Sequence, residues 1–196
     1  ARFNADARRL FEAAGSAGKL IVFAVRVDSF PREEGAATFY LGTNDPARLT
    51  ALRRAILRDA STLPIAGEYM HRDAFDIADR YGKDMFVAIE RLGTDWLPAL
   101  FAVKAWIDGL PFLQAGFSDR MMQRIGRLLP DHLPRAMRRF RDRFAHHLLL
   151  KVPEVAIGET RALLAALFAD TEADHFECPA PIAAKAFLHR FVAAGA

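Results

Sequence analysis

The feature that most constrains the fold is a strand–helix–strand pattern that occurs twice in this 196-residue chain. The first unit, from Ala37 to Met70, has a strand pattern in ATFYLGT, a helical pattern that begins at Asp45-Pro46, and a second strand pattern in LPIAGEYM. The second unit, from Leu148 to Ala194, has a strand pattern in HLLLKVP and a helical pattern in RALLAALFADT. It continues with HFECP and with AAKAFLHRFVA, an apolar run that we interpret as a further strand.

Two such units predict an α+β fold, namely a ferredoxin-like sandwich. The segment between them, from about Arg72 to His147, is mostly helical by pattern, so we interpret it as an insertion carried on a small α+β platform. We expect Leu148 to Val152 to pair with the strand that contains Phe39 to Leu41. The single cysteine, Cys178, excludes an internal disulfide framework, and we expect it to be a buried thiol.

The insertion concentrates positive charge. Between Arg120 and Lys151 there are eight arginines and one lysine against Asp131 and Asp142, a local net charge of +7 in a chain whose total is +3. The stretch LLPDHLPRAMRRFRDRFAHHLLLK predicts a helix with a solvated arginine face, and the apolar residues opposite are Leu133, Met137, Phe140, Phe144 and Leu148. Charge of this density indicates a polyanionic partner, either lipid headgroups or nucleic acid.

The residues upstream favour lipid. The run from Trp96 to Leu113 contains both tryptophans, a residue type enriched at bilayer interfaces. Lys104 and Asp108 interrupt this run, and Pro98 and Pro111 would break a long helix, so it falls short of the roughly 20 apolar residues needed to span a bilayer. We therefore favour binding at the membrane surface. Ordinary packed helices with a solvated outer face remain the alternative for this region.

A non-catalytic α+β module with a basic surface for RNA is the alternative from another functional class. Recognition of RNA by a sheet requires exposed aromatic residues on its central strands. Phe39 and Tyr40 are adjacent, so only one of them could face outward, and no glycine-aromatic signature accompanies them. We therefore expect no nucleic-acid partner.

The amino-terminal part has a helical pattern from Arg8 to Ala14, a glycine-punctuated turn, and a β-branched run from Leu20 to Val27 that predicts a strand. Gly18-Lys19 is not a phosphate-binding loop, because Ala13 and Leu20 occupy the positions where that motif has Gly and Ser or Thr. The small residues of the turn would instead let the backbone approach a ligand closely.

Several of these motifs carry a family resemblance. GSAGKLIVFAV resembles the closing turn and strand of the flavin domain in vanillyl-alcohol-oxidase-type FAD enzymes. AGEYMHRDAFDIADRYGKD, LLPDHLPRAMRRFRDRFAHHLLLK and KAFLHRFVAAGA are similar to the quinone-dependent, FAD-containing respiratory D-lactate dehydrogenases. The resemblance covers essentially the whole chain. It implies the end of a FAD-binding domain (1–31), the first half of a cap domain (32–71), a membrane-binding insertion (72–147) and the second half of the cap (148–196).

The resemblance also implies partners and sites. These are FAD near Gly15, Gly18 and Val22, D-lactate as substrate, a membrane quinone as electron acceptor, and an anionic phospholipid surface on the cytoplasmic face of a bacterial inner membrane. The implied membrane-binding residues are Arg120, Arg124, Arg127, Arg135, Arg138, Arg139, Arg141 and Arg143. The upstream phosphate-cradling loops are absent from this chain, so we expect the fragment alone to be inactive.

Candidate catalytic residues are His71 and Arg72, in a polar cluster at a predicted strand end. Arg72 could hold the carboxylate of a 2-hydroxy acid, and His71 could accept a proton. The alternative is an ordinary salt-bridged turn. The sequence predicts no metal site, because His146 and His147 are adjacent and would diverge on the predicted helix.

Overall fold

A computed structural model describes residues 19, 21–24, 35–110, 121, 124, 126, 131–168, 170 and 172–194. Residues 1–33 and 34–196 form two separate compact units. In the first unit, Ile21 to Ala24 lie in no strand, which corrects the strand predicted from Leu20 to Val27 at these positions. A strand requires a regular series of backbone hydrogen bonds to a neighbouring strand, and none of these four residues is assigned to one. The predicted helix from Arg8 to Ala14 lies outside the described residues.

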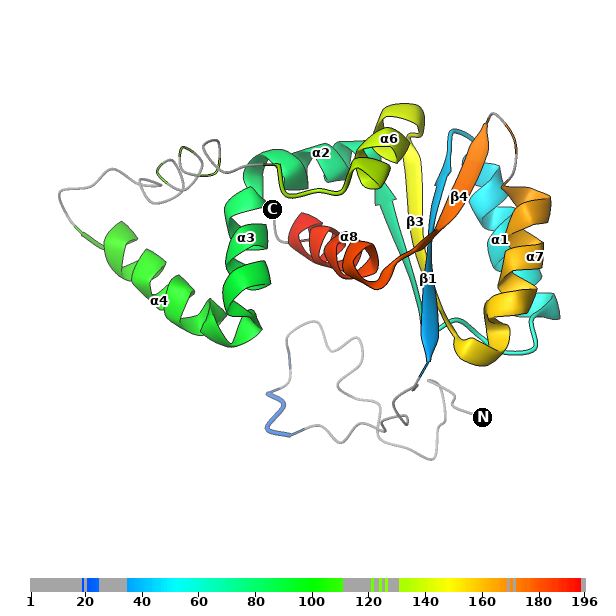
Figure 1. The fold of residues 1–196 in the computed structure, drawn as a ribbon. Helices are drawn as coiled ribbons and strands as arrows, with labels where there is room; N and C mark the ends of the chain where they lie inside the picture. The colour runs from blue at the N-terminus through cyan, green and yellow to red at the C-terminus, as the bar shows by residue number, and fades with distance from the viewer. Residues whose placement is uncertain are drawn as a thin grey trace. The chain divides into compact units, whose positions relative to one another are not determined.

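The second unit is a mixed α/β structure built on a four-stranded antiparallel sheet (Figure 1). Its strands lie in the order β2-β3-β1-β4. The predicted pairing is confirmed, because Leu148 to Val152 lie in β3 and pair with β1, with Leu149 opposite Tyr40. The strands are β1 (Ala36–Thr43), β2 (Ala66–His71), β3 (His146–Pro153) and β4 (Ala173–Cys178).

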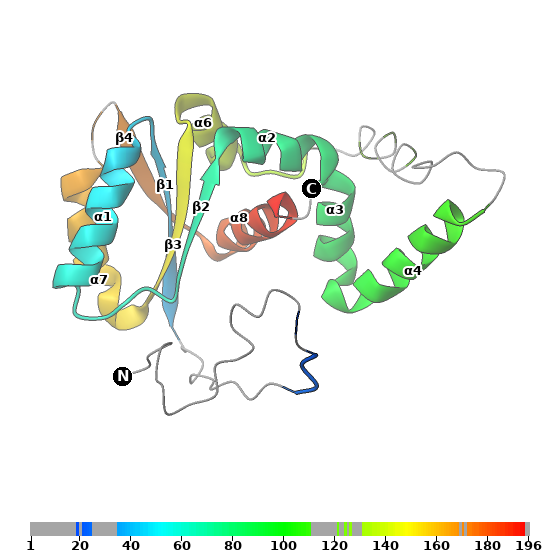
Figure 2. The ribbon, with the colours of Figure 1, turned by 180° about the vertical axis from the view of Figure 1, so that it is seen from behind.

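Helices cover both faces of this sheet (Figures 1 and 2). On one face lie α1 (Pro46–Asp59) and α7 (Ile157–Leu167), the latter preceded by a short 3-10 helix (Glu154–Ala156). On the other face lie α2 (Arg72–Tyr81), α3 (Lys83–Leu92), α6 (Arg135–Arg143) and α8 (Ala180–Ala193). A second 3-10 helix (Thr94–Trp96) leads from α3 into α4 (Leu97–Asp108).

The alternation of side chains along β1 explains the two layers. Phe39 and Leu41 point into the core beneath α1 and α7, while Tyr40 points into the core beneath α2, α3, α6 and α8. All three side chains are at most 1% exposed. Neither Phe39 nor Tyr40 can therefore stack on a base, which removes the sheet surface that the RNA-binding alternative required.

The carboxy-terminal apolar run is a helix, α8, and not the predicted strand. Its buried residues Ala186, His189 and Val192 recur every third position, which places them on one helical face. Pro181 lies in the first turn of this helix, where a missing N–H costs no hydrogen bond. The arginine-rich helix is also shorter than predicted, because Phe144 is extended and ends α6 before the sheet resumes at His146.

Candidate membrane-binding surface

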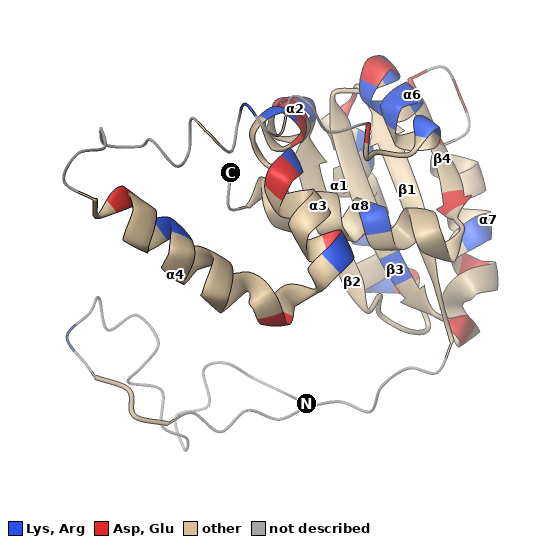
Figure 3. Cartoon of the chain, turned by 60° about the vertical axis from the view of Figure 1, so that its left-hand side comes forward, with Lys and Arg blue, Asp and Glu red and all other residues tan. Residues whose placement is uncertain are grey.

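Helix α4 is an apolar helix that the rest of the described chain leaves uncovered. None of its 12 residues is buried. Its exposed apolar side chains include Leu100, Phe101 and Val103, and Trp106 is 68% exposed. Trp96, just before the helix, is 58% exposed. Figure 3 shows that charged residues occupy only a small part of this helix.

Such a helix is unusual on a surface that faces only water. A helix that is apolar on most of its sides is normally buried in a core or in lipid. Twelve residues give a length of about 18 Å, against about 30 Å of hydrocarbon in a bilayer. In the part of the chain that the structure describes, no helix is long and apolar enough to cross a membrane. The geometry of α4 suits a helix that lies along an interface.

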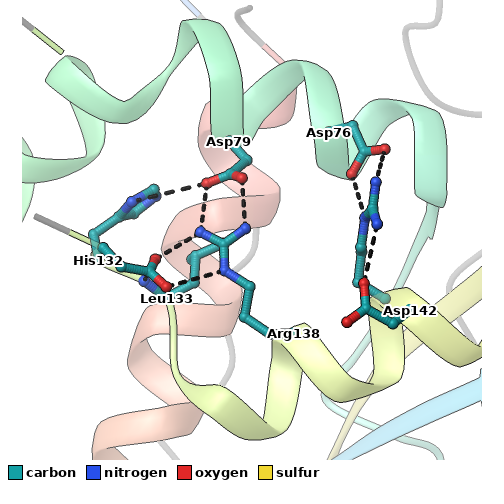
Figure 4. Close-up of polar contacts among 8 residues, drawn as sticks. Asp76, Asp79, His132, Leu133, Arg138 and Asp142 are labelled. Atoms are coloured by element: carbon teal, nitrogen blue, oxygen red, sulfur yellow. Dashed lines mark hydrogen bonds and ion pairs between the residues drawn. The ribbon is translucent and has the colours of Figure 1, made fainter. Parts of the chain in front are cut away.

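The arginine face of α6 is largely engaged inside the molecule, which corrects the prediction that it is solvated. Arg138 donates to both carboxylate oxygens of Asp79 on α2, with Nη2 2.8 Å from Oδ1. The same Nη2 lies 2.6 Å from Oδ1 of Asp131, and Arg138 Nε also donates to that carboxylate. Figure 4 shows the guanidinium of Arg138 facing Asp79. Arg138 therefore fastens α6 to α2 at their surface.

Arg141 repeats this arrangement one turn further along α6. Its Nε donates to Asp76 Oδ1 at 2.7 Å, its Nη2 donates to Oδ2 of the same carboxylate, and its Nη1 donates to Asp142 at 3.0 Å. Arg143 pairs with Asp174 of β4 at 2.8 Å. The signal in the sequence was the spacing of Asp76 and Asp79, three residues apart on α2, which matches the spacing of Arg138 and Arg141 on α6.

These ion pairs shift the carboxylates toward their charged form. The hydrogen bonds from Arg138 lower the pKa of Asp131, and those from Arg141 lower the pKa of Asp76. In return the carboxylates raise the pKa of both arginines. At neutral pH each of these two arginines is therefore held between two carboxylates.

The remaining predicted arginines differ. Arg135 and Arg139 are exposed and make no ion pair with a described residue, and Arg124 is exposed as well. Arg120 and Arg127 lie outside the described residues. Of the eight predicted positions, the structure therefore leaves Arg124, Arg135 and Arg139 with a guanidinium available to an external anion.

Three potential metal ligands meet where α2 approaches α6. One ligand atom each from Asp79, Asp131 and His132 lies within 4.8 Å of the others. Arg138 already donates to both carboxylates, so a guanidinium cation occupies the place that a metal cation would need. This cluster therefore acts as an ion-pair network.

The candidate catalytic residues lie where β2 runs into α2. His71 caps α2, because its Nδ1 accepts a hydrogen bond from the backbone N–H of Asp73 at 3.2 Å. The backbone N–H of Arg72 donates to Ala145 O at 2.8 Å, which ties the start of α2 to the segment before β3. Nearby, Tyr69 Oη lies 2.8 Å from His146 Nδ1. The local contacts of His71 are those of a helix cap.

Of the three predicted flavin-proximal residues, the structure describes Val22. Val22 is 51% exposed, and Gly15 and Gly18 lie outside the described residues. The neighbouring described residues, Ile21 and Phe23, are exposed as well.

Comparisons with known proteins agree with this surface. The family model described as D-lactate dehydrogenase, membrane binding, matches residues 38–196. The chain is 50% identical over 200 residues to a quinone-dependent D-lactate dehydrogenase of Escherichia coli (strain K12), and 47% identical over 201 residues to one of Haemophilus influenzae. A third, of Corynebacterium glutamicum, is 43% identical over 202 residues. These matches cover all of this chain but 35–36% of each relative, so the chain spans about a third of their length. The chain belongs to the family of D-lactate dehydrogenase membrane-binding domains.

Proposed function

We propose that this chain is the part of a quinone-dependent D-lactate dehydrogenase that attaches the enzyme peripherally to a membrane. The observation that carries the proposal is α4, which has no buried residue and exposes Leu100, Phe101 and Trp106. Transfer of such side chains from water to the boundary between headgroups and acyl chains is favourable, because it removes apolar surface from water. Trp96 and Trp106, at the two ends of the helix, suit the polar–apolar boundary itself.

We further propose that the surface is anionic phospholipid, on the cytoplasmic face of a bacterial inner membrane. Arg135 and Arg139 support this, because both are exposed and neither is paired with a described carboxylate. Each basic residue near such a surface contributes about 1 kcal/mol. Hydrophobic contact by α4 would therefore dominate attachment, and the free arginines would add a salt-sensitive part.

A vesicle co-sedimentation assay tests this proposal. In a variant that combines Phe101→Ser and Trp106→Ser, partition into anionic vesicles should fall about 50-fold, because each side chain loses about 1–1.5 kcal/mol of apolar burial. Val155→Ser is the matched control, since Val155 is 79% exposed but lies in the 3-10 helix before α7. Equal partition of the double variant and the unmodified chain would contradict the proposal.

For the platform we propose a ferredoxin-like cap domain interrupted by the membrane-binding insertion. The β2-β3-β1-β4 order and the placement of α1 and α7 on one face support it. We keep the proposed boundaries 1–31, 32–71, 72–147 and 148–196. Within the insertion, α2 and α6 contribute Phe75 and Met137 to the core, whereas α4 contributes no buried residue. Membrane contact is therefore concentrated in α4 and its surroundings.

For the whole enzyme we propose oxidation of D-lactate to pyruvate with transfer of electrons to a membrane quinone. The relatives are named for D-lactate and quinone, and such chemistry requires a redox cofactor, for which we propose FAD. Gly15, Gly18 and Val22 are the proposed contacts, but the described residues do not build a flavin site, so FAD would be held mainly by polypeptide outside this chain. The purified chain should therefore bind flavin poorly and oxidise no D-lactate. Stoichiometric flavin absorbance in the purified chain would contradict this.

A role for His71 and Arg72 at the substrate remains part of the proposal. His71 already serves as the cap of α2, so its replacement should act on stability as well as on turnover. His71→Asn would preserve a capping side chain while removing the imidazole. In the full-length enzyme, unchanged turnover by this variant would exclude His71 as a proton acceptor.

A further inference from the structure

Three histidines are buried in one core without hydrogen-bond partners. His132 precedes α6, His147 lies in β3 and His189 lies in α8, and their side chains are 6%, 1% and 0% exposed. None of their six ring nitrogens has a hydrogen-bond partner of good geometry in the described structure. A neutral imidazole carries one donor and one acceptor, and burial of both without a partner is costly.

These rings are packed among aromatic side chains that come from several elements. The ring centroids of His132 and Phe86 lie 4.4 Å apart, and those of His189 and Phe75 lie 4.3 Å apart. His132 and His189 are 6.2 Å from each other, and His147 is 5.9 Å from Phe75. The three histidines thus lie where the sheet packs against the helices α2, α3, α6 and α8. We call these four helices the histidine layer.

The charges around His132 and His189 oppose one another. Burial is the largest effect and lowers the pKa of each histidine to about 4. Asp79 on α2 favours the charged form of both, and Asp131 favours that of His132. Arg138 on α6 opposes both charges, Lys83 on α3 opposes that of His132, and His132 opposes that of His189. The backbone of Phe75 favours the charged form of His189.

His147 has no carboxylate that favours its charge. Burial lowers its pKa to about 4, and Arg72, His146 and His71 lower it further. The backbone of Phe144 has a smaller, opposite effect. On the side of β1, the ring of His147 contacts the ring of Tyr40, with centroids 5.7 Å apart. The hydroxyl of Tyr40 is also buried without a hydrogen-bond partner. A proton on His132 would face Asp79, whose Oδ1 lies 4.0 Å from His132 Nδ1. A proton on His147 faces no such carboxylate and can be solvated only if the histidine layer separates from the sheet.

The core on the opposite face of the sheet is built differently. The hydrophobic core beneath α1 and α7 includes no histidine among the described residues, and its buried polar neighbour on α7 is Thr160. His175 of β4, which is half-buried, has its Nδ1 2.8 Å from the backbone oxygen of Phe168. Among the described residues, that core therefore holds no fully buried histidine comparable to His147 or His189.

We propose that the fold contains an acid-sensitive device, in which mild acid detaches the histidine layer from the sheet while the layer of α1 and α7 stays packed. The detached form would take up protons on His132, His147 and His189. It would also expose Phe75 and Phe86 close in sequence to α4, which adds apolar surface to the membrane-binding part. This inference concerns the platform and does not depend on lipid binding by α4.

Hydrogen exchange of the full chain, analysed by peptide and corrected for intrinsic exchange rates, tests the device. Below about pH 6.5, each histidine that is neutral in the packed form and charged in the detached form raises the ratio of detached to packed molecules by up to roughly tenfold for each unit that the pH falls. Between pH 7 and pH 4.5 we expect protection of α2 and α8 to fall at least about 100-fold. Protection of α1 and α7 should change less than about tenfold.

The triple variant His132→Leu, His147→Leu, His189→Leu should keep α2 and α8 protected over this pH range. His175→Leu is the matched control on the other layer and should open α2 and α8 like the unmodified chain. Loss of protection in both layers together, or opening of the triple variant at the same pH as the unmodified chain, would overturn the proposal. If the triple variant does not fold, the single variants decide, because each should reduce the steepness by about a third and unchanged steepness in all three refutes the device.

Discussion

Arg138 and Arg139 are neighbours on α6, but only Arg138 is paired with carboxylates, so the two positions separate stability from membrane attachment. Arg138→Gln would leave Asp79 and Asp131 close together without their shared cation. The side chains of Arg138 and Asp79 are 30% and 27% exposed, so the loss lies between the 0–1 kcal/mol of an exposed pair and the 3–5 kcal/mol of a buried one. We expect about 2 kcal/mol. Arg139→Gln should change stability by less than about 0.5 kcal/mol.

For lipid binding we expect Arg139→Gln, and not Arg138→Gln, to have the larger effect. Arg139→Gln should lower partition into anionic vesicles about fivefold, since one free cation near the surface contributes about 1 kcal/mol. Arg138→Gln should change it less than about twofold, because the guanidinium of Arg138 already donates to Asp79 and Asp131 and is not available to a lipid phosphate. Urea denaturation followed by circular dichroism measures the first quantity, and co-sedimentation at low salt measures the second. If Arg138→Gln left the urea midpoint unchanged and weakened vesicle binding as much as Arg139→Gln, the ion-pair argument would be wrong.

Other perturbations follow from the same packing and charges. Gly42→Ala should lower stability by at least about 2 kcal/mol in thermal unfolding, because the added Cβ would lie 2.2 Å from a ring carbon of Phe144 in the core; a stability within 0.5 kcal/mol of the unmodified chain would contradict it. Asp76→Asn should destabilise the chain at pH 7, since Arg141 lowers the pKa of Asp76; the difference should vanish as the pH falls through that lowered pKa, and a pH-independent difference would refute this assignment. About 0.5 M NaCl should weaken but not abolish vesicle binding, because salt screens Arg139 and leaves the apolar contact of α4 unchanged; complete release by salt would contradict the dominance of α4.

The sheet could be predicted from the sequence because its strands are short apolar runs, in which successive side chains point to opposite faces. Phe39 to Leu41 alternate between two cores, and this requires helices on both faces. The same kind of signal misled the interpretation of the last segment, since periodicity cannot distinguish a short apolar run of a strand from one of a buried helix. Pro181 was the informative residue, because it is favoured in the first turn of a helix and removes a donor from a strand.

The arginine helix shows a limit of a different kind. The sequence predicts correctly that Met137 and Phe140 are buried and that the arginines lie on other sides of α6. It does not reveal whether a charged side meets water, lipid or another helix, because that depends on which element packs alongside. Asp76 and Asp79 lie about 60 residues away along the chain, and only the fold brings them to Arg138 and Arg141.

This arrangement inverts what water alone would favour. Arg138, Arg141 and Arg143 of α6 are paired with carboxylates of the chain, while the aromatic side chains of α4 are exposed. Exposure of Phe101 and Trp106 to water costs about 1–1.5 kcal/mol each relative to an apolar environment. An ion pair at the surface stabilises the fold by at most a similar amount. A chain selected only to fold in water gains nothing from this distribution. The inversion is explained if α4 meets an apolar boundary and the ion pairs between α2 and α6 hold the platform rigid at its side.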